Sequence, residues 1–303
     1  MKYYLLFLLL ISKFCFADCE QVSDRCAAVG EWEFSLSVGA GVTTNPVNGG
    51  DNIPLILIPE ISYYGENVFF ENNTLGYTFF DSDNVIVSVI TKLNHENAYF
   101  SRWHPQNIFI ESTTASSGSP IDVGTPDEGL PGQGLTDDEL NDENQRLEVN
   151  IDDIASKDWA IDAGVQINWF INQTIDIQVQ LLHDINKVYN GFNSQVQLTK
   201  MMNFKQLPDT ALSYSLGANI NSENLVDYFY GIPPESDLSQ EQVYQGKLSV
   251  NPYFRLDLTH QISARWNAKF TLKRLFLDNG TSDSPLVKDN HINTIFAGVT
   301  YDF

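Results

Sequence analysis

Apolar and polar residues alternate along most of the chain with a period of two. From Ile161 to Trp169, the odd positions hold isoleucine, alanine, valine and tryptophan, whereas the even positions hold aspartate, glycine, glutamine and asparagine. This period is typical of a β-strand that has one apolar and one polar face. Stretches with the helical period of 3.6 residues are scarce, so the sequence predicts an all-β protein.

Eleven strands are predicted in this way, and many are separated by turns rich in Gly, Asn and Asp. They cover Glu31–Thr43, Ile53–Tyr64, Val68–Phe80, Asn84–Asn94, Trp159–Phe170, Ile175–Leu181, Asn190–Met202, Leu212–Ile220, Gly246–Thr259, Gln261–Arg274 and His291–Phe303. A single-chain bacterial barrel has an even number of strands. We therefore expect twelve strands, with ten as the alternative. The candidates for the missing strand are Ala98–Ser112 and Leu225–Ile232.

The length of the predicted strands indicates a membrane barrel. Soluble strands usually have about 5–6 residues, whereas a tilted strand that spans a membrane needs about 9–11, and most of these stretches are that long or longer. If Gln261–Arg274 turned its polar face to lipid, each of its cations would cost about 2–4 kcal/mol near the midplane. The apolar faces must therefore contact lipid, and the predicted fold is a closed antiparallel transmembrane β-barrel.

This orientation places several charged side chains in the lumen. Inward-facing cations need partners, and carboxylates on the polar faces of other strands can pair with them. The predicted lumen-facing residues are Arg255, Arg265, Lys269 and Lys273, with Asp162, Asp176 and Asp257 as the acidic set.

The N-terminus has the features of a secretory signal peptide. Lys2 precedes the apolar stretch Tyr3–Ile11, and small residues favour cleavage after Ala17. We therefore expect a signal peptide at 1–17, a short periplasmic arm at 18–30 and an outer-membrane barrel at 31–303 in a Gram-negative cell. In the oxidising periplasm, Cys19 and Cys26 on this arm are a candidate disulfide.

Aromatic residues cluster near the ends of the predicted strands. Amphipathic rings settle at membrane–water interfaces, and the expected girdle consists of Trp32, Trp159, Trp266, Tyr63, Tyr64 and Tyr301. In the last strand, Tyr301 and the terminal Phe303 share the apolar face. A terminal aromatic residue on an alternating final strand is similar to the signal that the bacterial barrel-assembly machinery reads, so this machinery and outer-membrane lipid are expected partners.

The charge of the chain excludes some functions. The sequence has 17 basic and 39 acidic residues, a net charge of −22, which disfavours binding to nucleic-acid phosphates. Much of the acidity lies in a long loop at 95–156, where only Arg146 opposes eleven acidic residues between Asp122 and Asp153. Their spacing matches no EF-hand, so we expect a solvated external loop and no metal site.

No catalytic arrangement is visible in the sequence. There is no Gly-x-Ser-x-Gly elbow, zinc-spaced histidine pair or phosphate loop. His183 and Asp184 are adjacent, but neighbours in a strand point to opposite faces. We expect a protein that is not an enzyme and has no cofactor.

Several segments carry a family pattern: Trp32–Pro59 with its glycines and Ile53-Pro54, Leu75-Gly76-Tyr77, Asp158–Gly164, Tyr228–Ile232, and Arg274–Phe303 with its Tyr301-Asp302-Phe303 ending. Together they resemble the MltA-interacting protein (MipA)/OmpV family of outer-membrane proteins. The region Glu96–Asp153 and the two cysteines depart from the family pattern.

The resemblance implies an outer-membrane barrel without catalytic residues or cofactors. In the best-known members, it implies a scaffold that joins a murein-cleaving lytic transglycosylase to a murein-synthesising penicillin-binding protein. The alternatives are a small-solute channel, for which the lumen cations would favour anions, and a surface adhesin or antigen that acts through the loop Thr113–Asp153.

Overall fold

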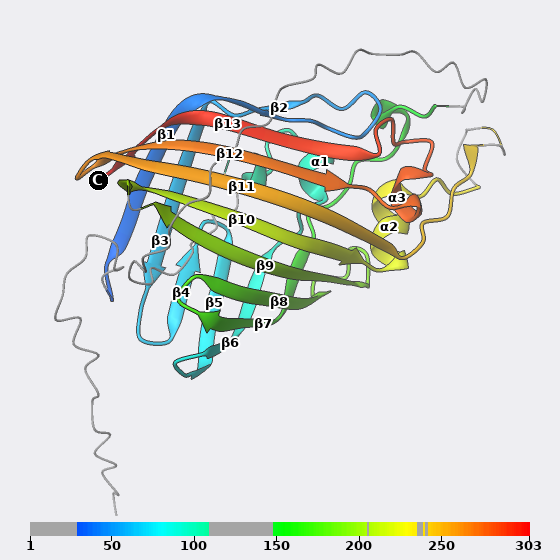
Figure 1. Cartoon of the computed structure of the whole chain (residues 1–303). Helices are drawn as coiled ribbons and strands as arrows, with labels where there is room; N and C mark the ends of the chain where they lie inside the picture. Colours follow the sequence, from blue (N-terminus) through cyan, green and yellow to red (C-terminus); the bar gives the residue numbers. More distant parts are fainter. Residues whose placement is uncertain (1–28, 109–147, 205, 235–238, 240–241) are drawn as a thin grey trace, which may run out of the picture.

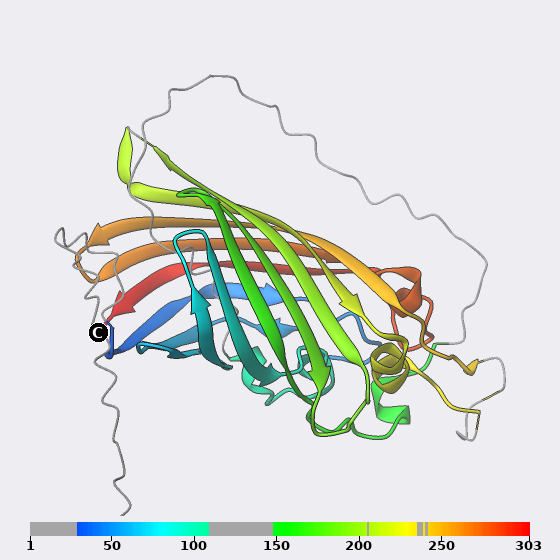
Figure 2. The same cartoon turned by 90° about the horizontal axis from the view of Figure 1, so that it is seen from below.

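The strands of the computed structural model form one closed antiparallel barrel. The structure describes residues 29–108, 148–204, 206–234, 239 and 242–303. The strands follow the chain order around the sheet, and β13 pairs with β1 to close it, as Figures 1 and 2 show. The predicted fold class, a closed antiparallel β-barrel, is confirmed.

The strands are long, as the alternation predicted. Their bounds are β1 Trp32–Thr43, β2 Ile53–Pro54, β3 Leu57–Tyr64, β4 Val68–Glu71, β5 Thr74–Asp81, β6 Val85–Leu93, β7 Ile161–Asn172, β8 Ile175–Asp184, β9 Phe192–Phe204, β10 Leu207–Asn221, β11 Ser249–Ser263, β12 Trp266–Phe276 and β13 His291–Asp302. Both β2 and β3 pair with β1, so together they form one interrupted strand. The barrel therefore has twelve strands, as expected.

The twelfth strand lies where the sequence predicted only one. The stretch Val68–Phe80 is divided into β4 and β5 by a turn at Asn72 and Asn73. Asn72 has a φ of 53°, a left-handed conformation that asparagine tolerates better than most residues. Its backbone N–H donates to the carbonyl of Ile61, which anchors the hairpin against β3.

Both candidates for the missing strand were wrong. Leu225–Ile232 lies mainly in helix α2 (Glu223–Tyr230), which begins where the side chain of Ser222 accepts a hydrogen bond from the Leu225 N–H. In the described part of Ala98–Ser112, helix α1 (Asn97–Phe100) and the 3₁₀ helix η1 (Pro105–Asn107) occur instead of a strand. Asn107 caps this segment by donating to the carbonyls of Ala98 and Ser101.

The predicted strand Gln261–Arg274 also crosses a turn. Residues up to Ser263 belong to β11, Ala264 and Arg265 form the turn, and β12 starts at Trp266. The alternation continues across the turn, so the pattern alone gave no sign of the break.

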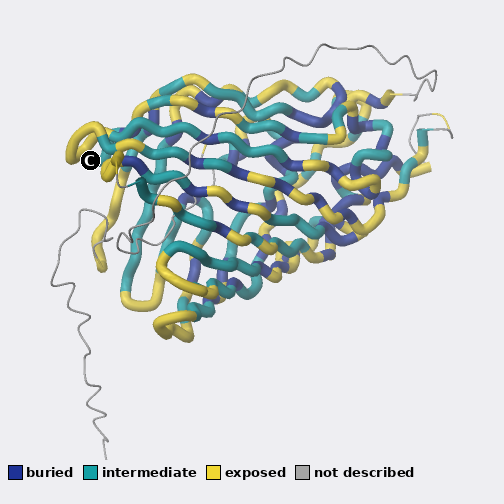
Figure 3. The backbone as a smooth tube through the Cα atoms, in the orientation of Figure 1, coloured by how far each residue is buried: buried dark blue, intermediate teal, exposed yellow. Residues whose placement is uncertain are grey.

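Burial follows the alternation in the order expected for a membrane barrel. On β8, Leu181 is 55% exposed while its neighbour Gln180 is 7% exposed; on β10, the values are 56% for Leu216 and 1% for Ser215. The apolar side chains therefore point outward and the polar ones inward, and Figure 3 shows this alternation as changes of colour along single strands. An outward apolar surface of this kind suits lipid.

The two ends of the barrel differ. Both ends of the described barrel and all its short turns except that at Asn72 and Asn73 lie at one end, whereas longer connections with α1, α2 and α3 (Asn279–Ser282) lie at the other (Figure 1). Outer-membrane barrels have short periplasmic turns and longer extracellular loops, so we call these the periplasmic and extracellular ends. Among the helices in the described ranges, none is long and apolar enough to cross a membrane.

Three expectations fall outside the described residues. They are the signal peptide at 1–17, the candidate disulfide Cys19–Cys26, and most of the acidic loop Thr113–Asp153. At the C-terminal end of this loop, the 3₁₀ helix η2 (Ile151–Asp153) is described and has a capping box with Asn150.

Candidate functional site: the interior of the barrel

The centre of the lumen holds a buried ion pair between two residues of one strand. Arg255 and Asp257 both point inward from β11, and the guanidinium donates to the carboxylate from Nε at 2.6 Å and from Nη2 at 2.9 Å. The hydroxyl of Thr271 on β12 donates to the same carboxylate at 2.8 Å. Because all three groups are buried, this bidentate geometry offsets the cost of removing the charges from water.

Of the other three predicted lumen cations, Lys269 and Lys273 line the bore, whereas Arg265 is exposed in a turn and does not face the lumen. Lys269 points inward from β12 and forms an ion pair with Glu60 of β3, across the seam made by β13 and β1. Lys273, nearer the extracellular end, lies 4.8 Å from the centre of the Tyr253 ring. Arg265 occupies the periplasmic turn after β11, where its Nη1 donates to the Tyr301 hydroxyl at 3.2 Å.

The predicted carboxylates of β7 and β8 have different surroundings. Asp162 is fully buried and accepts hydrogen bonds from the Tyr189 hydroxyl at 2.5 Å and from Asn94 at 2.7 Å. Asp176 lies near the periplasmic end of β8 and lines the larger cavity described below. Of the predicted acidic set, only Asp257 forms an ion pair among those recorded for the described residues, and the structure adds Glu60, which the strand patterns had not singled out.

An apolar plug packs across the extracellular mouth of the bore. We define the plug as the buried cluster Val47, Tyr99, Ala160, Tyr189, Leu225, Val226, Phe229, Tyr230, Tyr253, Leu275, Leu277, Val287 and Ile292. Four of its members come from α2 and the rest from strand ends and the other loops. The ring of Phe100 packs against two rings of the plug, with centroid distances of 5.7 Å to Phe229 and 5.5 Å to Tyr230.

A half-buried carboxyl group forms hydrogen bonds with a residue of the plug. Glu96 accepts from the Tyr230 hydroxyl at 2.5 Å and from the Asn221 amide at 3.0 Å. Burial raises the pKa of Glu96, although both hydrogen bonds act to lower it. The carboxyl group thus links three separate parts of the chain: the start of α1, the end of β10 and the end of α2.

Two histidines lie in the same extracellular connection as Glu96. The ring nitrogens of His95 bond to Gln106 at 2.8 Å and to the Tyr99 hydroxyl at 3.0 Å. His104 is fully buried against Trp159, with 5.1 Å between ring centroids. Burial, with a further contribution from His95, lowers the pKa of His104 to about 4, so this ring is neutral at pH 7 and suits its apolar surroundings.

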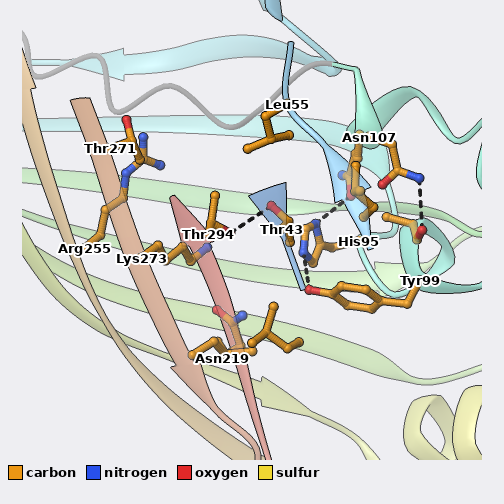
Figure 4. A pocket seen from close by; sticks show the side chains of 15 residues that line it. Thr43, Leu55, His95, Tyr99, Asn107, Asn219, Arg255, Thr271, Lys273 and Thr294 are labelled. Atoms are coloured by element: carbon orange, nitrogen blue, oxygen red, sulfur yellow. Dashed lines mark hydrogen bonds between the residues drawn. The ribbon is translucent and has the colours of Figure 1, made fainter. Parts of the chain in front are cut away.

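A small cavity of about 70 Å³ adjoins the plug, and Tyr99, Leu275 and Ile292 of the plug line it. Figure 4 shows Arg255 and Lys273 on one side of it and His95 and Tyr99 on the other. Thr43 and Thr294, from the strands of the seam, are joined by a hydroxyl hydrogen bond of 3.0 Å.

A larger cavity of about 290 Å³ fills the periplasmic half of the bore. Arg255 and Lys273 line both cavities, so these two side chains mark the boundary between them. The lining of the larger cavity is rich in glutamine, asparagine and threonine, and Tyr64, Phe69 and Phe170 line it at the periplasmic strand ends. No group of three or more His, Cys, Asp or Glu side chains that could hold a metal ion is found within the described residues.

The aromatic girdle is visible at the periplasmic rim. Trp32 packs against Tyr63, with 5.1 Å between ring centroids. Trp266 packs against Tyr301, and Tyr301 packs against Phe303, each pair with 5.0 Å between centroids. Tyr64 does not belong to this girdle, because it points inward from β3 and lines the larger cavity. Tyr64 pairs with Phe69, which faces inward. Because paired residues on neighbouring strands lie on the same face, this register shows that the Tyr64 side chain also faces inward.

The family model of the MltA-interacting protein MipA matches residues 36–303. The chain belongs to the MipA family. Two curated members, both called MltA-interacting protein, are similar to this chain: those of Escherichia coli (strain K12) and of Shigella flexneri. Each is 23% identical over 277 residues, which cover 91% of this chain and 92% of the relative. The family membership that the sequence motifs predicted is therefore confirmed.

Solved barrels are also similar to this MipA-family chain. The KdgM porin has a TM-score of 0.34 and 6% identity, with 90% of this chain and 99% of the porin covered. The translocator domain of the autotransporter NalP from Neisseria meningitidis has a TM-score of 0.37 and 9% identity, with 91% and 90% covered.

Proposed function

We propose that this protein is a non-enzymatic scaffold of the outer membrane that binds murein-cleaving and murein-synthesising enzymes at its periplasmic end. The observation that carries this proposal is the plug, because an apolar cluster across the extracellular mouth opposes the passage of polar solutes. Family membership adds that two relatives are named for an interaction with MltA. The expected partners are therefore a lytic transglycosylase and, as a second enzyme, a penicillin-binding protein.

The periplasmic end offers a charged surface for such partners. We call this surface the acidic rim, and it consists of the exposed residues Glu31, Glu33, Glu66, Asp81, Asp83 and Asp209. A ring of carboxylates attracts a partner with a basic surface and speeds their encounter, and added salt weakens the attraction. Enzymes that act on the murein layer approach from this side of the membrane.

Capture from detergent extracts tests the scaffold. The tagged barrel should enrich a lytic transglycosylase, and the double variant Glu66→Lys/Asp83→Lys should reduce that enrichment about tenfold or more, as expected when repulsion replaces attraction across an interface. The matched control is Glu148→Lys/Asp152→Lys, which reverses two exposed charges at the extracellular end and should capture as well as the wild type. If the wild-type barrel enriches no murein enzyme, the proposal is wrong.

Planar-bilayer recordings test the channel alternative. A scaffold with an intact plug should give no reproducible conductance. A channel would conduct anions and would lose its anion selectivity on Lys269→Glu, because this change places two carboxylates together where Lys269 now pairs with Glu60. Anion-selective conductance of the wild type would favour the channel over the scaffold.

A further inference from the structure

We propose that the larger cavity is a binding site for the end of an uncharged oligosaccharide that enters from the periplasm. The cavity lies inside the barrel, away from the acidic rim, so this proposal goes beyond the scaffold function and does not depend on it. Its volume of about 290 Å³ is close to the lower limit of small-ligand pockets, about 300–1,000 Å³. It therefore suits a short chain end rather than a long polymer.

Amide side chains form most of one wall of the cavity. Six of them project from the neighbouring strands β7, β8 and β9, in two rows: Gln166, Gln180 and Gln195 in one, and Asn168, Gln178 and Gln197 in the other. The rows follow from the period of two, because residues that are paired across strands have side chains on the same face. A strand wall with six adjacent amides offers many donors and acceptors without any charge.

The amides hold one another in fixed orientations and keep hydrogen-bonding groups for a ligand. Gln180 donates to the Gln166 oxygen at 2.7 Å, and Gln178 donates to the Asn168 oxygen at 3.1 Å. Each amide has two N–H donors and an oxygen with two lone pairs. In the described chain, the NH₂ groups of Gln166 and Asn168 donate to no other residue, so they remain for the hydroxyl or carbonyl oxygens of a ligand.

Side chains of β6 and β11, on either side of the amide strands, hold the same amides in place. The Tyr253 hydroxyl accepts from Gln195 at 3.0 Å and donates to Gln197 at 2.7 Å, and the Lys92 ammonium donates to the Gln180 oxygen at 2.8 Å. Bracing of this kind lowers the entropy cost of ordering side chains when a ligand binds.

Aromatic rings line the periplasmic end of the cavity. Tyr64, Phe69 and Phe170 come from the ends of β3, β4 and β7, and they present apolar surface beside the polar wall. Gly76 leaves room for the Phe69 ring, since a Cβ at this position would lie 2.1 Å from the Phe69 Cζ. A sugar ring has apolar C–H faces and a polar hydroxyl edge, so it matches a site with aromatic rings at one end and amides along one side.

The charges of the lining favour an uncharged ligand. Lys92, Arg255 and Lys273 are accompanied by Glu71 and Asp176, and Arg255 already forms its ion pair with Asp257. The lining therefore has nearly balanced charge, and an anion would gain little from it. Two sources supply uncharged saccharide ends: N-acetylated amino sugars of the bacterial cell wall, and plain glucans.

Calorimetric titration of the refolded full barrel tests the site. The micelles must consist of a zwitterionic detergent, because detergents with sugar headgroups would compete. The probes are triacetylchitotriose for cell-wall amino sugars, maltotriose for plain glucans and triglycine for an uncharged peptide. We expect saturable binding of one of the saccharides and none of triglycine. Binding of triacetylchitotriose alone identifies an amino-sugar site, and binding of maltotriose identifies a glucan site.

Matched variants place the binding in the cavity. Asn168→Ala and Gln166→Ala each remove hydrogen bonds to the ligand and should weaken saccharide binding about three- to tenfold. The control Asn267→Ala removes an inward amide of β12 that bonds to Asp302 outside the cavity and should leave binding unchanged. Heat-modifiable migration on gels reports whether each variant is folded.

Three results would overturn the proposal. They are the absence of saccharide binding at millimolar concentration, binding of triglycine in place of the saccharides, and saccharide binding that folded Asn168→Ala and Gln166→Ala retain at wild-type strength. Each leaves the scaffold proposal intact, because capture of murein enzymes is measured separately. Conversely, a barrel that captures no enzyme can still bind a saccharide.

Discussion

The two ends of the bore are built from different parts of the chain. At the periplasmic end, strand residues at every second position form an amide-rich wall around a cavity of about 290 Å³. At the extracellular end, residues of the connections between strands, such as Phe229 of α2 and Val287, form an apolar plug. The comparison teaches that strand alternation determines the lining of a barrel, whereas the loops determine whether the lining is open to both sides.

The largest effect is expected from a charge in the plug. Phe229 is fully buried in α2, and Phe229→Asp would place a carboxylate among aromatic rings, at a cost of several kcal/mol. The plug should open while the strands stay paired. Planar-bilayer recordings should then show conductance that the wild type lacks.

The control for this change is Phe229→Leu, which keeps the site apolar and should remain non-conducting. Conductance of the aspartate variant that does not exceed that of the control would show that the plug does not close the bore.

The next largest effect is expected on stability, from the buried ion pair of the barrel interior. Asp257→Ala leaves the buried Arg255 without its carboxylate and should lower the free energy of unfolding by about 3–5 kcal/mol. Urea titration of the folded barrel in micelles measures this change. The control is Asp51→Ala, which breaks the exposed pair between Asp51 and Arg102 and should cost less than about 1 kcal/mol. Equal losses for the two variants would contradict the role assigned to burial.

A smaller effect links the plug to pH. Burial raises the pKa of Glu96 above its ordinary value of 4.5, so the folded protein binds this proton more tightly than the unfolded chain does. Between the two pKa values, stability therefore decreases as the pH rises. Glu96→Gln, which cannot titrate, should remove this decrease from the pH profile of the urea midpoint.

His104 acts in the opposite direction. Its pKa of about 4 in the folded state is below its ordinary value of 6.5, so it increases stability as the pH rises from about 4 to 6.5. The difference between the wild type and Glu96→Gln isolates the carboxyl group, because both proteins contain His104. A pH profile that is the same for both would contradict the assignment to Glu96.

The smallest effect on stability is expected at the C-terminus. Phe303 is 76% exposed, so its deletion should change the free energy of unfolding by less than about 0.5 kcal/mol. If Phe303 is read by the assembly machinery, the deletion should nevertheless reduce the amount of barrel in the outer membrane. The control is Phe276→Ala at the extracellular end of β12, and an equal reduction there would argue against a terminal signal.

The wall could be predicted from the sequence because its physics is local. A strand with one face in lipid must alternate, so residues such as Asp257 and Lys269 were assigned to the polar face from their positions alone. The hairpin at Asn72 was not predicted, because the alternation of apolar and polar residues continues through its tight turn. The same continuity hid the turn at Arg265, which therefore lies at the rim and not along a strand.

The plug could not be predicted from alternation. The buried residues of α2 are Leu225, Val226, Phe229 and Tyr230, a spacing of a single helical face, so a test for the helical period would have found this helix. The amide rows were visible as polar positions of three strands. Their assembly into one wall depends on the pairing register, which brings Gln178 opposite Asn168 on one side and Gln197 on the other.

The plug receives residues from the first extracellular connection and from the last. Val47 follows β1 and Val287 precedes β13, and the two form a backbone bridge above the seam where β1 meets β13. The first and last loops can meet only once the ends of the sheet have come together. Closure of the barrel and occlusion of its extracellular mouth are thus a single event in biogenesis. An intermediate in which β1 and β13 have not yet paired has an incomplete plug and an open mouth.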